Sequence, residues 1–159
     1  MPVRILLADD HEVVRQGLRT ILQARPEWEI IGEADNGQRA IEAVKELRPD
    51  IVILDITMPI MSGLEATQAI AAAGVPTRVL IFTMHDSKSL VKAVRKAGAA
   101  GYVLKSRAAR DLIRAIEALL GGGMFFGPDL ATESPEKGEV KGFNLMFRSR
   151  LSCFSFIAL

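Results

Sequence analysis

The sequence has little cysteine: Cys153 is the only one among 159 residues, so the chain can form no internal disulfide. A lack of disulfides is compatible with the reducing cytoplasm. The chain also has no run of the roughly 20 apolar residues that a membrane-spanning helix needs. Its first apolar run meets Asp9 and Asp10 too soon for a signal peptide. These absences predict an intracellular, cytoplasmic protein that does not enter a membrane.

An excess of charge of either sign is absent as well. The 20 Lys and Arg residues against 19 Asp and Glu residues give a formal net charge of +1. This balance argues against broad electrostatic attraction to nucleic acid or to a membrane surface. With 49% hydrophobic and 25% charged residues, the composition is that of a globular protein. The length allows one domain with a proper core, but not two of ordinary size.

Short apolar runs alternate with amphipathic stretches up to residue 120. Strands are predicted at residues 3–8, 28–34, 51–54, 78–83 and 101–105. Helices are predicted at residues 11–24, 38–48, 64–73 and 89–97, and a last one is capped by Ser106 and ended by the glycines at 121–123. Five strands alternating with five helices imply right-handed crossovers and a doubly wound α/β sandwich. We expect one domain over residues 1–123 and a separate tail over 124–159.

The segment Ile51–Leu54, followed by Asp55, is the clearest of these strands. Four consecutive apolar residues, three of them β-branched, indicate a strand buried on both faces of a parallel sheet. An isolated Asp at a strand end is more often a capping residue. Three further strands, however, also end in polar side chains: the pair Asp9 and Asp10, then Thr83, then Lys105. Parallel strands bring their carboxyl ends to one edge, where ligands bind, so these side chains should converge.

Three carboxylates crowded together repel one another and need a counter-charge. A hard divalent cation with oxygen ligands, most plausibly Mg²⁺, would supply it. Together with a free carboxylate, a hydroxyl and an ammonium, such a site has the parts for phosphoryl transfer. The carboxylate would attack as the nucleophile while the metal and the Lys neutralise the phosphoryl oxygens.

These residues resemble the receiver domain of the response regulators of two-component systems. The resemblance covers residues 3–123 and rests on Asp9-Asp10, Leu54-Asp55 followed by Met58-Pro59 and Ser62-Gly63, Thr83, and Tyr102 with Lys105. It implies a flavodoxin-like (βα)5 fold with strand order 2-1-3-4-5. It also implies that the protein is no enzyme acting on other molecules, since it would catalyse only its own aspartyl phosphorylation and dephosphorylation.

The resemblance assigns a role to each site residue. Asp55 would accept a phosphoryl group from a sensor histidine kinase. Asp10, Asp55 and the backbone carbonyl of Thr57 would bind Mg²⁺, and Asp9 would hold it through water. Lys105 would pair with the phosphoryl oxygens.

A second group of residues is implicated in switching and in reaction rate. Thr83 would donate a hydrogen bond to the phosphoryl group, and Tyr102 would turn inward as the aromatic switch. Thr57 and His85 flank the expected path of the hydrolytic water, so they would tune the phosphoryl lifetime. His11 and His85 could also suggest a phosphorelay or metal role, but unpaired surface histidines are more often simply solvated.

Several motifs are similar to regulators with a LuxR-type helix-turn-helix output domain, namely residues 9–11, 33–37, 98–105 and 124–128. This similarity implies transcription control and a homodimer that forms on phosphorylation. The tail 124–159 shows no helix-turn-helix pattern, and its four Lys and Arg balance four Asp and Glu. We therefore expect DNA binding only through an output domain that this chain lacks. We interpret the chain as a truncated or frameshifted regulator with a poorly ordered tail; alternatively, the apolar tail docks on the receiver or on a partner. For this 159-residue chain we expect a stand-alone receiver that acts by protein–protein contact without binding DNA.

The sequence fits two other classes of protein less well than it fits a receiver domain. A haloacid-dehalogenase-like phosphatase also uses a strand-end Asp, but it needs a second acid two residues later, where Thr57 stands. A flavodoxin needs a phosphate loop rich in Gly and hydroxyl groups after the first strand. The acidic residues at 9–12 would repel a phosphate there.

Overall fold

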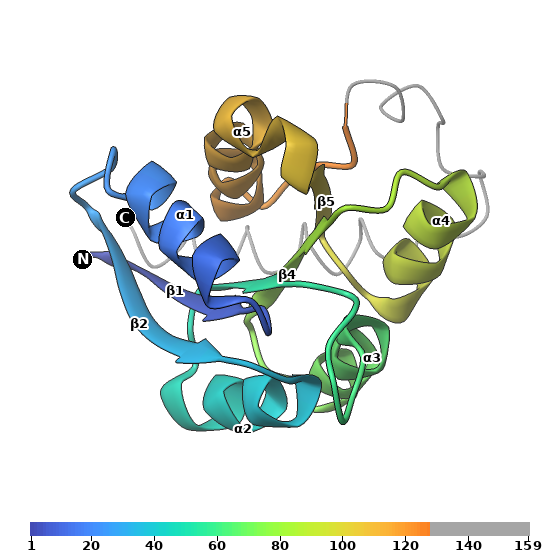
Figure 1. Ribbon diagram of the computed structural model, residues 1–159. Coiled ribbons are helices and arrows are strands. Elements are labelled where there is room, and N and C mark those ends of the chain that lie inside the picture. The colour runs from blue at the N-terminus through green and yellow to red at the C-terminus, as the bar shows by residue number, and fades with distance from the viewer. Residues whose placement is uncertain (128–159) are drawn as a thin grey trace, which may run out of the picture. The chain divides into compact units, whose positions relative to one another are not determined.

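Five parallel strands form one sheet in the computed structural model, which describes residues 1–127 (Figure 1). The strands are β1 (Val3–Ala8), β2 (Trp28–Ala34), β3 (Ile51–Leu54), β4 (Arg78–Thr83) and β5 (Gly101–Leu104). Their order in the sheet is β2-β1-β3-β4-β5. The predicted flavodoxin-like order is therefore confirmed.

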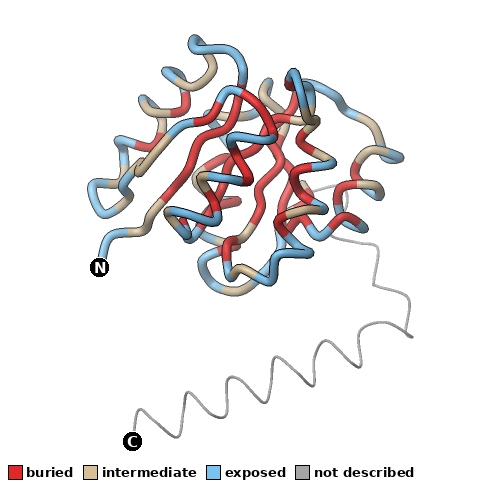
Figure 2. The backbone as a smooth tube through the Cα atoms, turned by 90° about the horizontal axis from the view of Figure 1, so that it is seen from below, coloured by how far each residue is buried: buried red, intermediate tan, exposed pale blue. Residues whose placement is uncertain are grey.

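Five helices cover the two faces of this sheet. They are α1 (Glu12–Leu22), α2 (Gly37–Leu47), α3 (Gly63–Ala72), α4 (Lys88–Ala97) and α5 (Ala108–Leu120). Helices α1 and α5 lie together on one face, and α2 and α3 lie on the other, with α4 next to α3 (Figure 1). The buried strands run through the middle, and the outer faces of the helices are exposed (Figure 2).

Strand β3 lies at the centre of the sheet, and its four residues are at most 1% exposed. Because helices cover both faces, apolar side chains are needed on both sides of the strand, which explains its uninterrupted apolar run. On the face covered by α1 and α5, the core joins side chains of β1, β3 and β4 to Leu112 and Ile116 of α5. Full burial of each such side chain contributes about 1.5–3 kcal/mol.

Side chains cap three of the helices at their N-termini. Asn36 accepts a hydrogen bond from the backbone of Arg39, and Ser62 accepts one from Glu65. Ser87 caps α4 in the same way. Such caps satisfy backbone N–H groups that the first helical turn leaves unpaired.

The predicted cap of the last helix is wrong. Ser106 lies inside a 3₁₀ turn, η1 (Lys105–Arg107), and α5 begins after it with Arg107 at its N-cap and no side-chain cap bond. The backbone N–H of Ala108 instead donates to the carbonyl of Lys105. Because this tighter turn satisfies the amide, the hydroxyl of Ser106 is not needed as a cap.

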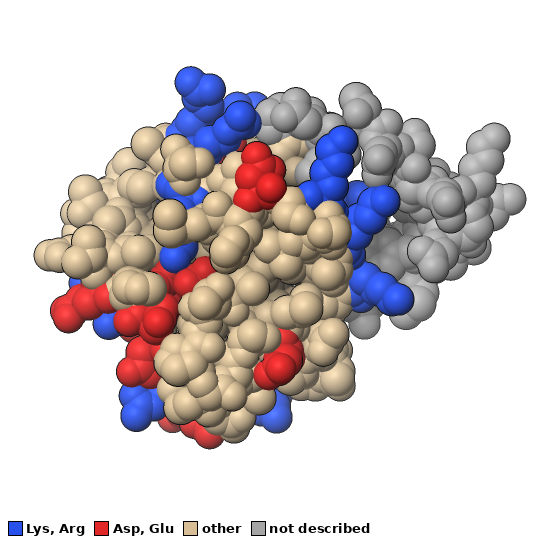
Figure 3. Space-filling model, turned by 45° about the vertical axis from the view of Figure 1, so that its right-hand side comes forward, with Lys and Arg blue, Asp and Glu red and all other residues tan. Residues whose placement is uncertain are grey.

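Helix α4 is strongly amphipathic. Val91 and Val94 face the core, whereas Lys88, Lys92 and Lys96 are exposed. Lys and Arg side chains gather on this side of the molecule without Asp or Glu side chains among them (Figure 3).

Within residues 1–127, no helix is long and apolar enough to cross a membrane. The cytoplasmic location stays a prediction. The division into a domain at 1–123 and a tail at 124–159 also stays a prediction, and residues 128–159 lie outside the described part of the chain.

Candidate functional site

The polar strand ends converge at the carboxyl edge of the sheet, as predicted. Asp9 follows β1, Asp55 follows β3, and Lys105 follows β5. The ammonium Nζ of Lys105 lies 2.7 Å from Oδ2 of Asp9 and 3.2 Å from Oδ2 of Asp55. One cation therefore joins two carboxylates that are 46 residues apart in the chain.

A cluster of acidic side chains surrounds this ion pair. Ligand atoms of Asp9, Asp10, His11 and Asp55 all lie within 4.8 Å of one another. Asp9 and Asp55 are only 1% and 5% exposed, respectively. A set dominated by carboxylate oxygens suits a hard cation such as Mg²⁺ or Ca²⁺. The cluster could thus hold a metal ion, and it contains Asp9, Asp10 and Asp55, whose roles as ligands stay a prediction.

The surroundings of Asp55 and Lys105 raise the pKa values of both residues. Burial raises the pKa of Asp55, and the nearby charge of Asp9 adds to this effect, while Lys105 partly offsets it. Burial alone would lower the pKa of Lys105, but its hydrogen bond to Asp9 and the charges of both carboxylates raise it. The two carboxylates therefore favour the charged form of Lys105. The charge of Lys105, in turn, offsets only part of the cost of burying the negative charge of Asp55.

The loop after β3 fixes the position of Asp55. The backbone N–H of Asp55 donates to the carbonyl of Ala8 at 2.9 Å, and that of Ile56 donates to Oδ1 of Asp55 at 2.8 Å. Gly63 then comes so close that a Cβ there would lie 1.9 Å from the backbone oxygen of Asp55. The Ser62-Gly63 motif thus has two structural reasons: the hydroxyl caps α3, and the missing side chain admits the carbonyl of Asp55.

Thr83 and Tyr102 both contact His85 in the loop between β4 and α4. Oγ1 of the fully buried Thr83 accepts a hydrogen bond from the backbone N–H of His85 at 3.2 Å. The hydroxyl of Tyr102 donates to the backbone carbonyl of the same residue. The Tyr102 side chain is 4% exposed, and burial raises its pKa. Tyr102 therefore occupies an inward position in this structure.

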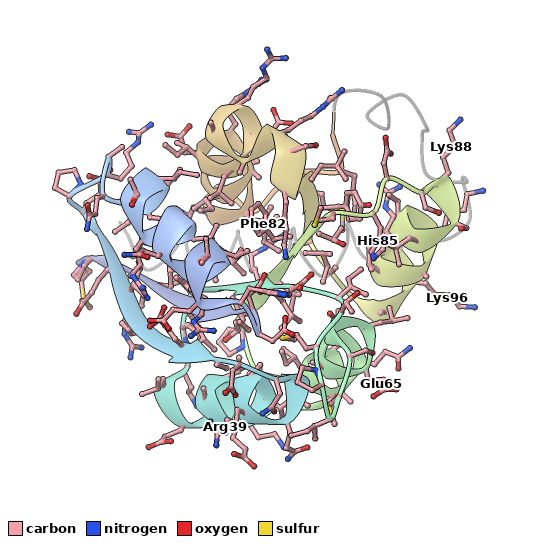
Figure 4. All side chains as sticks on the ribbon, viewed as in Figure 1. Arg39, Glu65, Phe82, His85, Lys88 and Lys96 are labelled. Carbon is pink, nitrogen blue, oxygen red and sulfur yellow. The ribbon has the colours of Figure 1, made fainter. Side chains whose placement is uncertain are left out.

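The remaining predicted residues lie at the rim. Thr57 is exposed in the loop after Asp55, and the His85 side chain lies in the loop that leads into α4 (Figure 4). The sequence suggested a role for the His85 side chain, but here it is the His85 backbone that binds Thr83 and Tyr102. No sequence pattern could have indicated these backbone contacts.

Sequence reasoning missed the contacts of His11. Its ring is largely solvated, as expected, but Nδ1 lies 3.0 Å from Oδ1 of Asp10 and 3.3 Å from Oδ1 of Asp9. The backbone N–H of His11 also donates to Asp9 at 2.8 Å. The only available signal was that His11 directly follows the acidic pair.

Comparison with known proteins identifies the family. The response regulator receiver domain matches residues 5–117. The transcriptional regulatory protein LnrK of Bacillus subtilis (strain 168) is 37% identical over 146 residues, which make up 89% of this chain and 66% of LnrK. The response regulator UvrY of Escherichia coli (strain K12) is 35% identical over 143 residues, or 86% of this chain and 66% of UvrY. The chain thus spans about two thirds of the length of these relatives.

Solved structures agree with this assignment. A two-component response regulator of the LuxR family from Aurantimonas sp. SI85-9A1 superimposes with a TM-score of 0.78 at 41% identity, covering 84% of this chain and 95% of that one. The receiver domain of the putative response regulator NarL from Mycobacterium tuberculosis gives a TM-score of 0.73 at 34% identity, over 76% and 98% of the two chains.

These relatives confirm the predicted resemblance, including its LuxR-type subfamily. Because LnrK is named as a transcriptional regulator, the comparisons do not favour the alternative of a stand-alone receiver. The matched residues 5–117 contain the whole acidic cluster, Thr83, Tyr102 and Lys105. The chain therefore belongs to the response regulator receiver domain family of two-component systems.

Proposed function

We propose that this receiver is a switch that is phosphorylated on Asp55 by a sensor histidine kinase. The observation that carries the proposal is the ammonium of Lys105, which lies between two buried carboxylates at the ends of different strands. A cation in this place is suited to a carboxylate that will gain a phosphoryl group, because it can pair with the added negative oxygens. The chain would catalyse only its own phosphorylation and dephosphorylation.

In the proposed reaction, a carboxylate oxygen of Asp55 forms a bond to phosphorus. At the same time the bond between phosphorus and the imidazole nitrogen of the kinase histidine breaks. The backbone N–H of Ile56 orients one oxygen of Asp55, and Lys105 lies beside the other. These two contacts hold the nucleophile in place before the donor arrives.

The cluster of Asp9, Asp10 and Asp55 fits a Mg²⁺ ion by its oxygen donors and their mutual distance of at most 4.8 Å, which also includes His11. The backbone carbonyl of Thr57 would complete the protein ligands. When bound, the ion would neutralise negative charge among the carboxylates and on the incoming phosphoryl group. Asp9 meanwhile keeps Lys105 at the site through their contact at 2.7 Å.

Switching would begin at Thr83. Its hydroxyl can donate to a phosphoryl oxygen on Asp55 once it no longer binds the N–H of His85. The loop between β4 and α4 would then rearrange beside Tyr102, whose ring is already inward in this structure with its hydroxyl bound to the His85 carbonyl. We further propose that the side chains of Thr57 and His85, at the rim, tune the phosphoryl lifetime.

The output of the switch would be transcription control through a homodimer. LnrK is named as a transcriptional regulatory protein, and one similar structure is of RcsB dimers bound to DNA, with 25% identity and a TM-score of 0.75. We propose that this receiver acts likewise within a regulator whose output domain binds DNA.

Labelling with acetyl phosphate, followed by the intact mass of the protein, tests the proposed function. We expect the gain of one phosphoryl group in the presence of Mg²⁺ and none after removal of Mg²⁺ with EDTA. Equal labelling with and without the metal would refute the role of the acidic cluster. No labelling under either condition would refute the receiver activity itself.

A further inference from the structure

Arg15, in the first turn of α1, reaches back to the acidic edge of the sheet. Its Nη1 donates a hydrogen bond to the backbone carbonyl of Asp9 at 2.6 Å. The Arg15 side chain is only 17% exposed, although arginine side chains are mostly solvated. Helix α1 packs on β1 and β2, which brings this guanidinium beside the turn that carries the acidic pair (Figure 1).

Four contacts fix the position of Asp9, and the one to its carbonyl comes from Arg15. The N–H of Asp9 donates to the carbonyl of Ala34 at 3.0 Å. Its Oδ1 accepts a hydrogen bond from the N–H of His11 at 2.8 Å, and its Oδ2 lies 2.7 Å from Nζ of Lys105. The contact from Arg15 adds a tie between Asp9 and a side chain of α1. Asp9 is thereby attached both to the sheet and to the helix that follows it.

Glu33 of β2 orients the guanidinium of Arg15. Its Oε1 lies 3.6 Å from Nε of Arg15, the distance of an ion pair. The same oxygen accepts a hydrogen bond from Nη1 of Arg19, one turn further along α1. Of these two arginines, Arg15 alone donates to Asp9 within residues 1–127. Arg19 thus shares the helix, the charge and the acidic partner of Arg15 but not its contact with the cation site.

The turn between β1 and α1 depends on this contact because α1 has no side-chain cap. His11 stands at its N-cap and makes no cap hydrogen bond with its side chain. A helix start without such a cap leaves its first N–H groups unpaired and is less stable. Movement there would displace Asp10 and His11, which belong to the cluster of ligand atoms within 4.8 Å of one another. The hydrogen bond from Arg15 opposes this movement.

We propose that Arg15 is a positioning residue of the cation site. By holding the carbonyl of Asp9, it keeps the carboxylates of Asp9 and Asp10 close to Asp55 before an ion arrives. Residues that orient metal ligands without touching the metal typically contribute about 10- to 100-fold to metal affinity. This inference rests on the proposed function for its metal, Mg²⁺, but not on the phosphoryl group.

A purely structural role of Arg15 predicts a different result. If Arg15 only supported the packing of α1 on β2 through Glu33, then Arg15→Ala and Arg19→Ala should lower the Tm alike and leave Mg²⁺ affinity unchanged. A positioning role requires a loss of Mg²⁺ affinity that is specific to Arg15. The two arginines therefore form a matched pair.

Calorimetric titration of Mg²⁺ into the full 159-residue chain, without a phosphoryl donor, tests this role. We expect Arg15→Ala to weaken Mg²⁺ binding by about tenfold or more, and Arg19→Ala to leave it unchanged. Arg15→Lys should recover part of the affinity, because an ammonium can still donate to the Asp9 carbonyl, and it also serves if Arg15→Ala does not fold. Equal Mg²⁺ affinity of the Arg15 and Arg19 variants would overturn the positioning role. Binding by Arg15→Lys that is no better than that of Arg15→Ala would overturn it as well.

The rate of labelling by acetyl phosphate at increasing Mg²⁺ concentration gives a second readout. We expect Arg15→Ala to need about tenfold more Mg²⁺ for half of its maximal rate, yet to reach the wild-type rate at saturating Mg²⁺. An unchanged Mg²⁺ requirement with a lower maximal rate would overturn the positioning role, because Arg15 would then act on phosphoryl transfer itself. Mg²⁺ binding by the wild-type chain without any labelling would overturn the proposed function and leave the role of Arg15 intact. Absence of Mg²⁺ binding by the wild-type chain would overturn the role of Arg15.

Discussion

Among single residues, Lys105 has the largest effect on the electrostatics of the site. Asp9 and Asp55 are both buried, and without a nearby cation their negative charges would repel each other strongly. The ammonium lies within 3.2 Å of both carboxylates, yet burial still raises the pKa of Asp55. The unphosphorylated site thus retains unfavourable charge that a bound cation would relieve.

The substitution Asp55→Asn should stabilise the fold at neutral pH in the absence of metal. Because burial raises the pKa of Asp55 in the folded state, the folded protein binds this proton more tightly than the unfolded chain does. The resulting stability is present at low pH and is lost as pH rises through the folded pKa. We expect the variant to have the higher Tm at pH 7, with the difference narrowing as pH falls toward the ordinary Asp pKa of about 3.9. A thermal scan at several pH values checks this; a difference independent of pH would contradict it.

The substitution Lys105→Ala should separate metal binding from phosphoryl transfer. The ammonium competes with a cation for Asp9 and Asp55, so its loss should leave Mg²⁺ affinity equal or higher by calorimetric titration. Phosphorylation by acetyl phosphate should slow by about tenfold or more, because one preorganised charge is lost from the site. Lys88→Ala, on the exposed face of α4, serves as the control and should change neither quantity. Weaker Mg²⁺ binding in Lys105→Ala would show that Lys105 organises the acidic cluster instead.

Among the structural elements, the loop between β3 and α3 has the tightest packing around the site. The N–H of Gly63 donates to the carbonyl of Ile56 at 2.8 Å, which closes the loop beneath Asp55. Ile60, in the same loop, has a φ of 71° although it is β-branched. Backbone strain of this kind is frequent next to functional groups.

The substitutions Gly63→Ala and Gly17→Ala should change the free energy of unfolding in opposite directions. A methyl group at Gly63 would overlap the backbone of Asp55, and backbone cannot move aside cheaply. We expect a loss of at least about 3 kcal/mol in the free energy of unfolding, at the upper end of overpacking effects. Gly17 lies exposed in α1 with no atom within 4 Å of the added methyl, so Ala there should stabilise the protein by about 1 kcal/mol. Urea denaturation measures both, and similar effects of the two substitutions would refute this difference in packing.

The substitution Ile60→Gly should stabilise the protein or leave its stability unchanged. Ile60 is 83% exposed, so its removal exposes little core, while the left-handed backbone costs a side chain about 1–2 kcal/mol. Greater freedom of glycine in the unfolded chain offsets part of this, up to about 1 kcal/mol. A loss of more than about 1 kcal/mol in urea denaturation would mean that the Ile60 side chain makes a stabilising contact.

The elements themselves could be predicted because each has a strong local signal. The buried run of β3 and the periodic helices follow from the apolar pattern, and helix bounds differ by only one or two residues at most ends. The cap at Ser106 was predicted wrongly because a 3₁₀ turn precedes α5. The parallel bridge between Phe125, after α5, and Gly101 of β5 could not be predicted, since its hydrogen bonds are made by backbone atoms that any residue carries.

At the scale of the whole described molecule, residues from distant parts of the sequence meet at one edge of the sheet. The sheet order and parallel direction are enough to predict that Asp9, Asp55, Thr83 and Lys105 gather there. Topology does not predict the hydrogen bonds that Tyr102 makes, from its hydroxyl to the His85 carbonyl and from its N–H to the carbonyl of Phe125 after α5. Phe125 pairs with the edge strand β5, so the site and the edge of the sheet belong to one compact unit, residues 1–127.

The most direct test of the central claim is the intact mass of three proteins after treatment with acetyl phosphate and Mg²⁺. The wild-type chain and the variant Asp35→Asn, which alters an exposed carboxylate that pairs with Arg39 and is not one of the clustered ligands, should each gain one phosphoryl group. The variant Asp55→Asn should gain none. Undiminished labelling of Asp55→Asn would contradict the assignment of Asp55 as the phosphoryl acceptor.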